Sequence, residues 1–177
     1  MGIQTIKTMA TVSAPAHRHL KPNIDDPVWN NVRDYVANFM IEHDVKTHIS
    51  FLAPGFDQLC ASTAHWLGKD IAVVRPFPDH ARPWPPKERE TAEMLMLVAK
   101  DIATISQTPT RSSVREAYAK IVDEADALLV LDAGKSAIVS NATKRAQERN
   151  IPIYVSSGLD IMDGTFHALQ ADGQGED

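Results

Sequence analysis

The chain has 177 residues, 44% of them hydrophobic and 23% charged, as is typical of a soluble globular protein. Its net charge of −5 argues against nucleic acid as a partner, because broad nucleic-acid binding usually needs a basic face. The single cysteine excludes an internal disulfide and suits a cytoplasmic location, and no apolar stretch is long enough to suggest a membrane-bound protein.

The first half of the chain alternates apolar runs with amphipathic segments. Residues 6–14 predict a strand, and a loop follows it. Asp26 before Pro27 marks the start of a helix that ends near His43, because an acceptor followed by proline suits a first helical turn. Residues 46–53 and 70–77 predict the next two strands. The helix between these strands starts after Gly55 and ends at Gly68.

The second half continues the same alternation. A proline-rich loop leads to a predicted helix over 87–100 and a short strand over 101–106. The spacing of Ser113 and Glu116 predicts a capping box at the start of the next helix. The remaining predicted elements are a buried strand at 127–132, a helix at 135–149 and a last strand at 151–157.

This order of elements predicts an α/β fold. We expect a three-layer, Rossmann-like domain over residues 1–160, with a mostly parallel sheet of five or six strands and helices on both faces. Residues 161–177 are predicted to form a polar, acidic tail that is partly disordered. In such a sheet the loops after each strand share one edge, where ligands bind.

Glycine, polar and cationic residues follow the predicted strands at this edge. Gly55 lets backbone N–H groups approach a ligand, and an acid at position 57 could accept a hydrogen bond from a sugar hydroxyl. The candidate ligand contacts are His17, Arg18, Gly55, Asp57, Gln58, Arg115, Gly134, Lys135 and Ser136. We expect neither a cofactor nor a metal site, since the histidines are scattered and show no zinc-binding spacing.

Four segments follow one another in an order that resembles the SLOG superfamily of Rossmann-like domains, and within it the YpsA-like branch, which is related to DprA and to the LOG proteins. They are "AHRHL", "APGFDQLCASTAHWLG", "PFPDHARPWPPKERE" and "VREAYAKIVDEADALLVLD". His17, Arg18, Gly55, Asp57 and Arg115 match the family pattern.

Other positions depart from the family pattern. Ala16 and Phe51 replace glycines, Glu116 replaces an asparagine, and Gly134-Lys135-Ser136-Ala137 stands where the family has Gly-Gly-Thr. Each lost glycine adds a Cβ atom where a phosphate would approach. The LOG catalytic signature, Pro-Gly-Gly-x-Gly-Thr-x-x-Glu, is absent from the sequence.

The resemblance implies a homodimer that binds a nucleotide or a nucleotide-derived small molecule, with N-glycosidic hydrolysis as an extension. Asp57 and Glu116 would then orient or activate water. The alternative is a non-catalytic scaffold for protein interactions in which the ligand pocket has degenerated.

Several of these residues also have plainer interpretations. His17 and Arg18 could be solvated loop residues, Gly55 and Asp57 could be turn and helix-start residues, and Glu116 fits a capping box. A P-loop is excluded, because that motif needs a glycine where Leu129 stands. Cys60 lies on the apolar stripe of its helix, which predicts core packing. Trp84 could stack on a base or cover the core.

Overall fold

The computed structural model describes residues 5–13, 23–132, 136–157 and 160–169, and the side chain of Met162 is not among the described groups. Its parallel strands are β1 (Thr8–Ser13), β2 (Thr47–Ser50), β3 (Asp70–Arg75), β4 (Asp101–Thr104), β5 (Ala127–Asp132) and β6 (Ile153–Ser157). The helices between them are α1 (Asn30–Glu42), α2 (Phe56–Trp66), α3 (Pro86–Val98), α4 (Ser113–Glu124) and α5 (Ala137–Glu148). A 3₁₀ turn, η1 (Pro27–Trp29), precedes α1, and α6 (Asp160–Asp163) and β7 (His167–Ala168) end the described chain.

The strands form one seven-stranded sheet in the order β4-β3-β2-β1-β5-β6-β7. Strands β1 to β6 are parallel, and β7 runs antiparallel to β6. The register pairs Met9 with His48 on one side of β1 and with Ala127 on the other. The predicted α/β class and the mostly parallel sheet are therefore confirmed.

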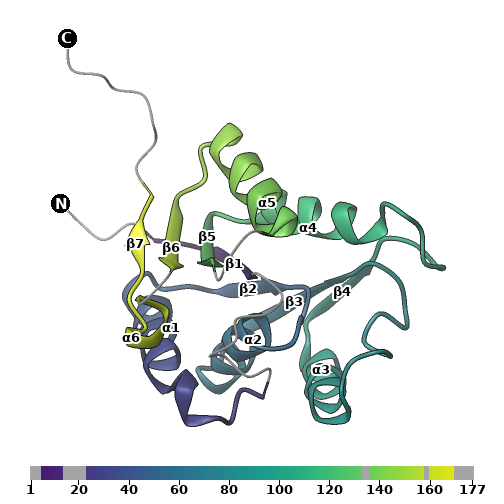
Figure 1. Ribbon diagram of the computed structural model, residues 1–177, viewed down its shortest axis with the longest axis horizontal. Coiled ribbons are helices and arrows are strands. Elements are labelled where there is room, and N and C mark those ends of the chain that lie inside the picture. Colours follow the sequence, from purple (N-terminus) through teal and green to yellow (C-terminus); the bar gives the residue numbers. More distant parts are fainter. Residues whose placement is uncertain (1–4, 14–22, 133–135, 158–159, 170–177) are drawn as a thin grey trace.

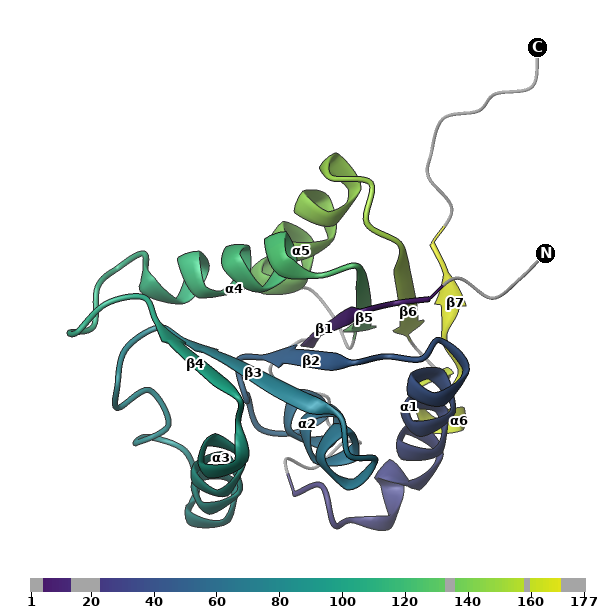
Figure 2. The same ribbon diagram turned by 180° about the vertical axis from the view of Figure 1, so that it is seen from behind.

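Helices cover both faces of this sheet, as Figures 1 and 2 show from opposite sides. Helices α1, α2, α3 and α6 lie on one face, and α4 and α5 lie on the other. Each face has its own apolar core: Trp29, Phe56 and Leu95 belong to the first, and Ile121 and Val139 to the second. Burial on both faces explains why the strand over 127–132 reads as a continuous apolar run.

The boundaries of most elements agree with the sequence prediction to within a few residues. The capping box is an exception. Helix α4 has Ser112 at its N-cap position, and the Ser112 hydroxyl donates a 2.7 Å hydrogen bond to the Glu116 carboxylate. The Ser113 hydroxyl instead donates to the Thr110 carbonyl, so it stabilises the preceding turn.

The fold continues beyond residue 160, where the sequence prediction ended the domain. Ile161 and Phe166 are buried in the first core, and the Phe166 ring stacks on Tyr35 at a centroid distance of 4.6 Å. Gly164 has a φ of +70°, and a Cβ atom there would lie 2.5 Å from the Asn31 carbonyl carbon. The segment is therefore fitted closely against α1. The rest of the predicted tail, residues 170–177, lies outside the described residues.

The chain order creates a switch point between β1 and β5. From β1 the chain builds β2, β3 and β4 outward to one side, with its helices on one face. It then crosses back to β5 and β6 on the other side of β1, with α4 and α5 on the opposite face. Open sheets of this type bind ligands at the carboxyl ends of their strands, next to such a point.

Candidate functional site at the carboxyl edge of the sheet

Asp57, a predicted ligand contact, lies inside the protein at the start of α2. Its side chain is 2% exposed. One carboxylate oxygen, Oδ1, accepts hydrogen bonds from the Thr11 hydroxyl at 2.6 Å and the Ser50 hydroxyl at 2.8 Å, and Oδ2 accepts from the Ala53 N–H at 3.0 Å. Asp57 therefore joins the first turn of α2 to two strands and to the loop before the helix.

His48 extends this buried polar network. Its Nε2 atom lies 3.1 Å from the Thr11 hydroxyl oxygen. Because Thr11 gives its proton to Asp57, its oxygen accepts from the Nε2–H of His48. The Nδ1 atom of His48 is buried, and it has no hydrogen-bond partner among the residues that the structure describes. The imidazole is thus held neutral, with its proton directed toward Thr11.

Burial moves the pKa values of both titratable groups in opposite directions. It raises the pKa of Asp57 from 3.8 to about 6, although the bonds from Thr11, Ser50 and Ala53 work against the rise. It lowers the pKa of His48 from 6.5 to about 3. Both shifts have the same cause, since burial disfavours whichever form is charged.

The loop between β2 and α2 has a strained backbone that this network supports. Leu52 has a φ of +62° although its side chain is fully buried, a conformation that costs a non-glycine residue on the order of 1–3 kcal/mol. Its N–H donates to the Ser50 hydroxyl at 2.9 Å. The amide of Gln58 donates to the Leu52 carbonyl at 3.1 Å and to the Glu88 carbonyl at 2.9 Å. Gln58, 1% exposed, thus ties the loop to α3 from inside.

Gly55 occupies the N-cap position of α2 with a φ of +91°. That conformation favours glycine, so local geometry alone accounts for the residue. A Cβ atom there would lie 3.5 Å from the Trp29 ring, an ordinary contact distance, so the backbone conformation and not crowding favours glycine. The turn interpretation of Gly55 therefore has direct geometric support.

The other predicted site residues fall into two groups. His17, Arg18, Gly134 and Lys135 belong to segments that follow β1 and β5 in the chain, and all four lie outside the described residues. Ser136, Arg115 and Glu116 are described. Ser136 caps α5, and its hydroxyl accepts a 3.4 Å hydrogen bond from the Val139 N–H. Arg115 and Glu116 are exposed in the first turn of α4.

Cys60 and Trp84 both pack with the apolar cores, Cys60 within one and Trp84 against both. Cys60 lies on α2 and is fully buried in the first core, where burial raises the pKa of its thiol. Trp84 is half-buried against both cores, and its ring meets that of His80 edge-on at 5.1 Å. Within the described ranges, no cluster of three His, Cys, Asp or Glu side chains could hold a metal ion. Nor does any described helix have the length and apolar character to cross a membrane.

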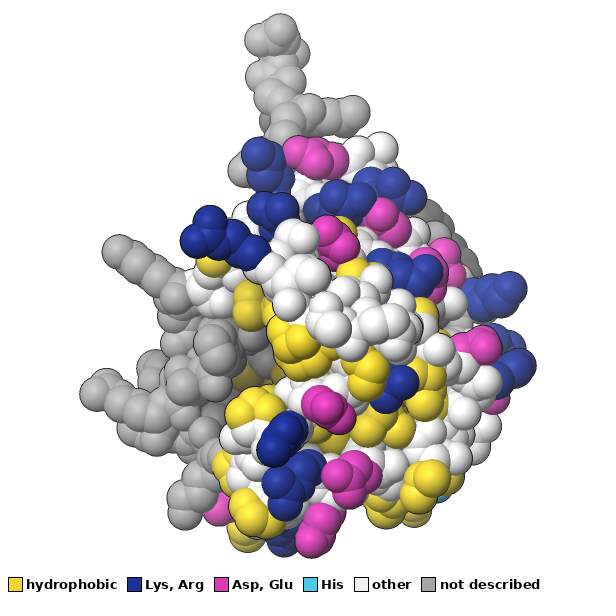
Figure 3. Space-filling model, turned by 90° about the vertical axis from the view of Figure 1, so that its right-hand side faces the viewer, with side chains coloured by type: hydrophobic (Ala, Val, Ile, Leu, Met, Phe, Trp, Pro, Cys, Tyr) yellow, Lys and Arg dark blue, Asp and Glu magenta, His cyan; other side chains and the backbone are white. Residues whose placement is uncertain are grey.

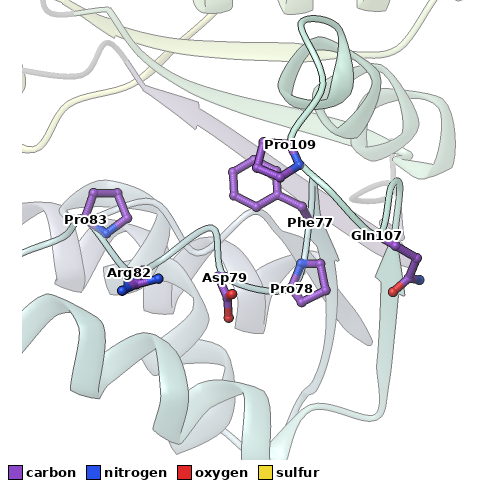
Figure 4. A pocket seen from close by; sticks show the side chains of 7 residues that line it. All are labelled: Phe77, Pro78, Asp79, Arg82, Pro83, Gln107 and Pro109. Carbon is purple, nitrogen blue, oxygen red and sulfur yellow. The ribbon is translucent and has the colours of Figure 1, made fainter.

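A cavity of about 510 Å³ lies between the loops that follow β3 and β4 (Figure 4). Phe77, Pro78, Asp79, Arg82 and Pro83 line it from the loop after β3. Two residues from the loop after β4, Gln107 and Pro109, complete the lining. The cavity is therefore at the same edge as the switch point, toward the β4 side of the sheet.

The two loops around this cavity are basic although the chain is acidic. Counted with Arg75 at the end of β3 and with the first turn of α4, residues 75–85 and 105–116 carry four arginines and two carboxylates, a surplus of two positive charges against −5 for the whole chain. The arginines are Arg75, Arg82, Arg111 and Arg115. The loops lie on the right-hand side of Figure 1, and Figure 3 shows apolar side chains across the middle of that face with charged side chains around them.

Phe77 and Arg82 fall within the segment "PFPDHARPWPPKERE" that resembles the family, but neither is among the candidate ligand contacts predicted from the sequence. Within this segment the sequence singles out only Trp84, as a residue that could stack on a base or cover the core. Gln107 and Pro109 carried no signal, because a loop residue lines a cavity only when another loop faces it. The prolines on both loops, which stiffen the backbone, are the one sequence feature that could have indicated a cavity between these loops.

Comparison with known proteins gives structural neighbours only. No protein-family model matches the chain, and no curated protein matches it. DNA processing protein A from Helicobacter pylori superposes with a TM-score of 0.60 at 14% identity over 85% of this chain. The same protein from Streptococcus pneumoniae superposes with a TM-score of 0.61 at 15% identity over 89% of this chain.

This likeness confirms the Rossmann-like fold, which the chain shares with DNA processing protein A. The chain spans only part of these neighbours, 65% of the H. pylori chain and 54% of the S. pneumoniae chain. The likeness also corrects the expectation that nucleic acid is not a partner. The H. pylori protein, which has this fold, binds single-stranded DNA. The argument against nucleic acid as a partner was therefore wrong, because it took an overall charge for the charge of a site.

Proposed function

We propose that the protein binds a nucleotide or a nucleotide-derived small molecule at the carboxyl edge of its sheet. One observation carries the proposal: on an acidic chain, the loops after β3 and β4 and the residues that flank them carry a surplus of positive charge, and a cavity lies between these loops at the edge where folds of this kind bind their ligands. The phosphate of a nucleotide supplies the matching negative charge. Arg18 and Lys135, on segments that follow β1 and β5 in the chain, would add cations to the same edge.

A thermal-shift screen against nucleoside mono-, di- and triphosphates, cyclic nucleotides and ADP-ribose tests this proposal. A ligand at a hundred times its dissociation constant stabilises the folded state by about 2.7 kcal/mol. Arg18→Ala and Arg115→Ala should each weaken binding about tenfold, since each removes a charge-assisted bond. Lys7→Ala is the matched control, because this exposed cation directly precedes β1 at the opposite edge. If no compound raises the melting temperature, the scaffold alternative is preferred.

Single-stranded DNA is the second candidate ligand. The observation that favours it is the fold shared with the H. pylori protein. Fluorescence anisotropy of a labelled oligodeoxythymidylate tests it, with a duplex of equal length as the comparison. Binding to the single strand that weakens as salt rises supports this candidate. Equal binding to both forms, or none, argues against it.

We propose binding without hydrolysis. Of the two carboxylates suggested as catalysts, Asp57 already accepts three hydrogen bonds in the interior, and Glu116 is paired with Ser112. Chromatography of a nucleotide incubated with the protein should show no released base. Membership of the YpsA-like branch, with eroded glycine motifs, and the homodimer that it implies are further proposals. Light scattering during size-exclusion chromatography tests whether the protein is a homodimer.

A further inference from the structure

The cavity between the loops after β3 and β4 is open to solvent and combines apolar and polar lining residues. Phe77 contributes a half-buried aromatic ring, and Pro78, Pro83 and Pro109 contribute rigid apolar surface without N–H groups. In Figure 4 the Phe77 ring lies at the same end of the cavity as Pro109. Asp79, Arg82 and Gln107 add a carboxylate, a guanidinium and an amide.

We propose that this cavity binds the base of the nucleotide, with the face of the base against the Phe77 ring; this inference rests on the proposed function. A nucleobase has flat apolar faces and a polar edge, and the lining offers one aromatic face and a few polar groups. A volume of about 510 Å³ is within the usual range for small-molecule sites. Stacking on an aromatic ring accepts any base, because every base has a π-face.

The polar groups have separate tasks in this arrangement. Arg82 is an exposed lining residue, and its guanidinium attracts the phosphate of the same nucleotide. The carboxylate of Asp79 accepts hydrogen bonds from an exocyclic amino group, and the Gln107 amide can both donate and accept. Asp79 also repels a phosphate, so it orients the nucleotide with its base inward and its phosphate beside Arg82.

Hydrogen bonds hold the walls of the cavity in place before any ligand arrives. The Ser106 N–H donates to the Pro76 carbonyl at 3.0 Å, which ties the loop after β4 to the loop after β3. The His80 ring lies 3.2 Å, by its Nε2 atom, from the Phe51 carbonyl, which ties the loop after β3 to the loop after β2. Little ordering of the loops is then needed on binding, which favours affinity.

Isothermal titration with the four ribonucleoside 5′-monophosphates and with ribose 5-phosphate tests the base site on the unaltered protein. At least one nucleotide should bind tenfold or more tightly than ribose 5-phosphate, as expected from stacking one base on one ring. Equal affinity for the sugar phosphate and all four nucleotides would overturn the base site but leave the proposed function intact. Failure of every nucleotide and of oligodeoxythymidylate to bind would overturn both.

Substitutions then locate the base. Phe77→Ala should weaken nucleotide binding about tenfold and leave ribose 5-phosphate binding unchanged, and Phe77→Trp should restore it. Phe77→Leu keeps apolar volume without an aromatic face, so it should bind like Phe77→Ala while melting near the unaltered protein. Trp66→Ala is the control, because this 80% exposed ring lies on α2 away from the cavity. Normal nucleotide affinity in Phe77→Leu and Phe77→Ala would contradict the proposal.

The base of a free nucleotide and a base within single-stranded DNA share this chemistry. Repeating the Phe77 series with a labelled oligodeoxythymidylate separates the two sources. A Phe77-dependent loss with the mononucleotide alone assigns the cavity to a free nucleotide. The same loss with the oligonucleotide assigns it to a base of the strand. Indifference of both to Phe77 overturns the proposal.

Discussion

The hydroxyl of Thr11 donates a 2.6 Å hydrogen bond to the carboxylate of Asp57, which lies 46 residues farther along the chain. This contact joins the centre of β1 to the first turn of α2, beneath the loop that carries the strained Leu52. It also connects Asp57 to His48 through the same hydroxyl. The carboxyl edge is thus supported from below by a buried network that joins two strands and a helix.

The raised pKa of Asp57 predicts how the Asp57→Asn variant responds to pH. The pKa of Asp57 is about 6 in the folded protein and 3.8 in the unfolded chain, so folding takes up a proton when the pH lies between these values. The stabilisation from this group is present below pH 3.8 and is lost as pH rises through 6, by about 3 kcal/mol. The variant lacks this change. In urea unfolding from pH 4 to 8, its stability relative to the unaltered protein should therefore rise with pH, whereas a constant offset would contradict the burial of Asp57.

The lowered pKa of His48 predicts the opposite dependence of stability on pH. Its folded pKa of about 3 is below the unfolded value of 6.5, so the unfolded chain binds a proton first as pH falls. Stability is lost as pH falls from 6.5 toward 3, and His48→Phe should remove that loss. The variant should therefore gain stability relative to the unaltered protein between pH 6.5 and pH 4. If the free energies of unfolding of the two proteins changed in parallel with pH over this range, the imidazole would not be held neutral.

Gln58 should prove to be a structural residue. Gln58→Met keeps the length of the side chain but leaves the Leu52 and Glu88 carbonyls without their donor, which should cost about 2 kcal/mol. Gln107→Met is the control, since that side chain is exposed. Urea unfolding measures both. If Gln58→Met were as stable as the control, the amide would not hold the loop to α3.

Gly164 tests whether the segment beyond residue 160 belongs to the fold. Gly164→Ala places a Cβ atom within 2.6 Å of the Asn31 carbonyl oxygen, and a backbone atom cannot easily move away. We expect a loss of more than about 2 kcal/mol, in the range typical of strain in a packed interior. Gly68→Ala is the matched control, because its φ is +72° but nothing lies within 4 Å, so only the backbone cost of about 1 kcal/mol applies. Equal losses would mean that this segment does not pack against α1.

Two variants of Ser136 distinguish its role as a helix cap from a role as a ligand contact. Ser136→Ala should lower stability by about 1 kcal/mol, because α5 loses the acceptor for the Val139 N–H, and Ser136→Asp should retain the cap. If Ser136 also contacts a phosphate, Ser136→Asp weakens nucleotide binding by charge repulsion. Thermal unfolding and titration of the same two variants therefore answer both questions.

Local patterns were enough to predict the sheet, but not the support beneath its edge. The continuous apolar run at 127–132 and the glycine at position 68 define elements from neighbouring residues alone. The burial of Asp57 depends on Thr11 and Ser50, which come from other strands. An acid in a first helical turn is ordinarily solvated, so nothing near it in the sequence signals the network. Strand β7 escaped prediction because two residues carry no periodicity.

The most direct test of the central claim is a ¹⁵N–¹H correlation spectrum recorded during titration with the tightest-binding nucleotide. The account predicts that shifted amides cluster after β2, β3 and β4, at residues such as Ala53, Phe77 and Gln107. Amides at the opposite edge, such as Lys7, and around the exposed Trp66 should stay unchanged. Shifts confined to Trp66 and its neighbours on α1 and α3, or no shifts at saturating nucleotide, would contradict a ligand site at the carboxyl edge.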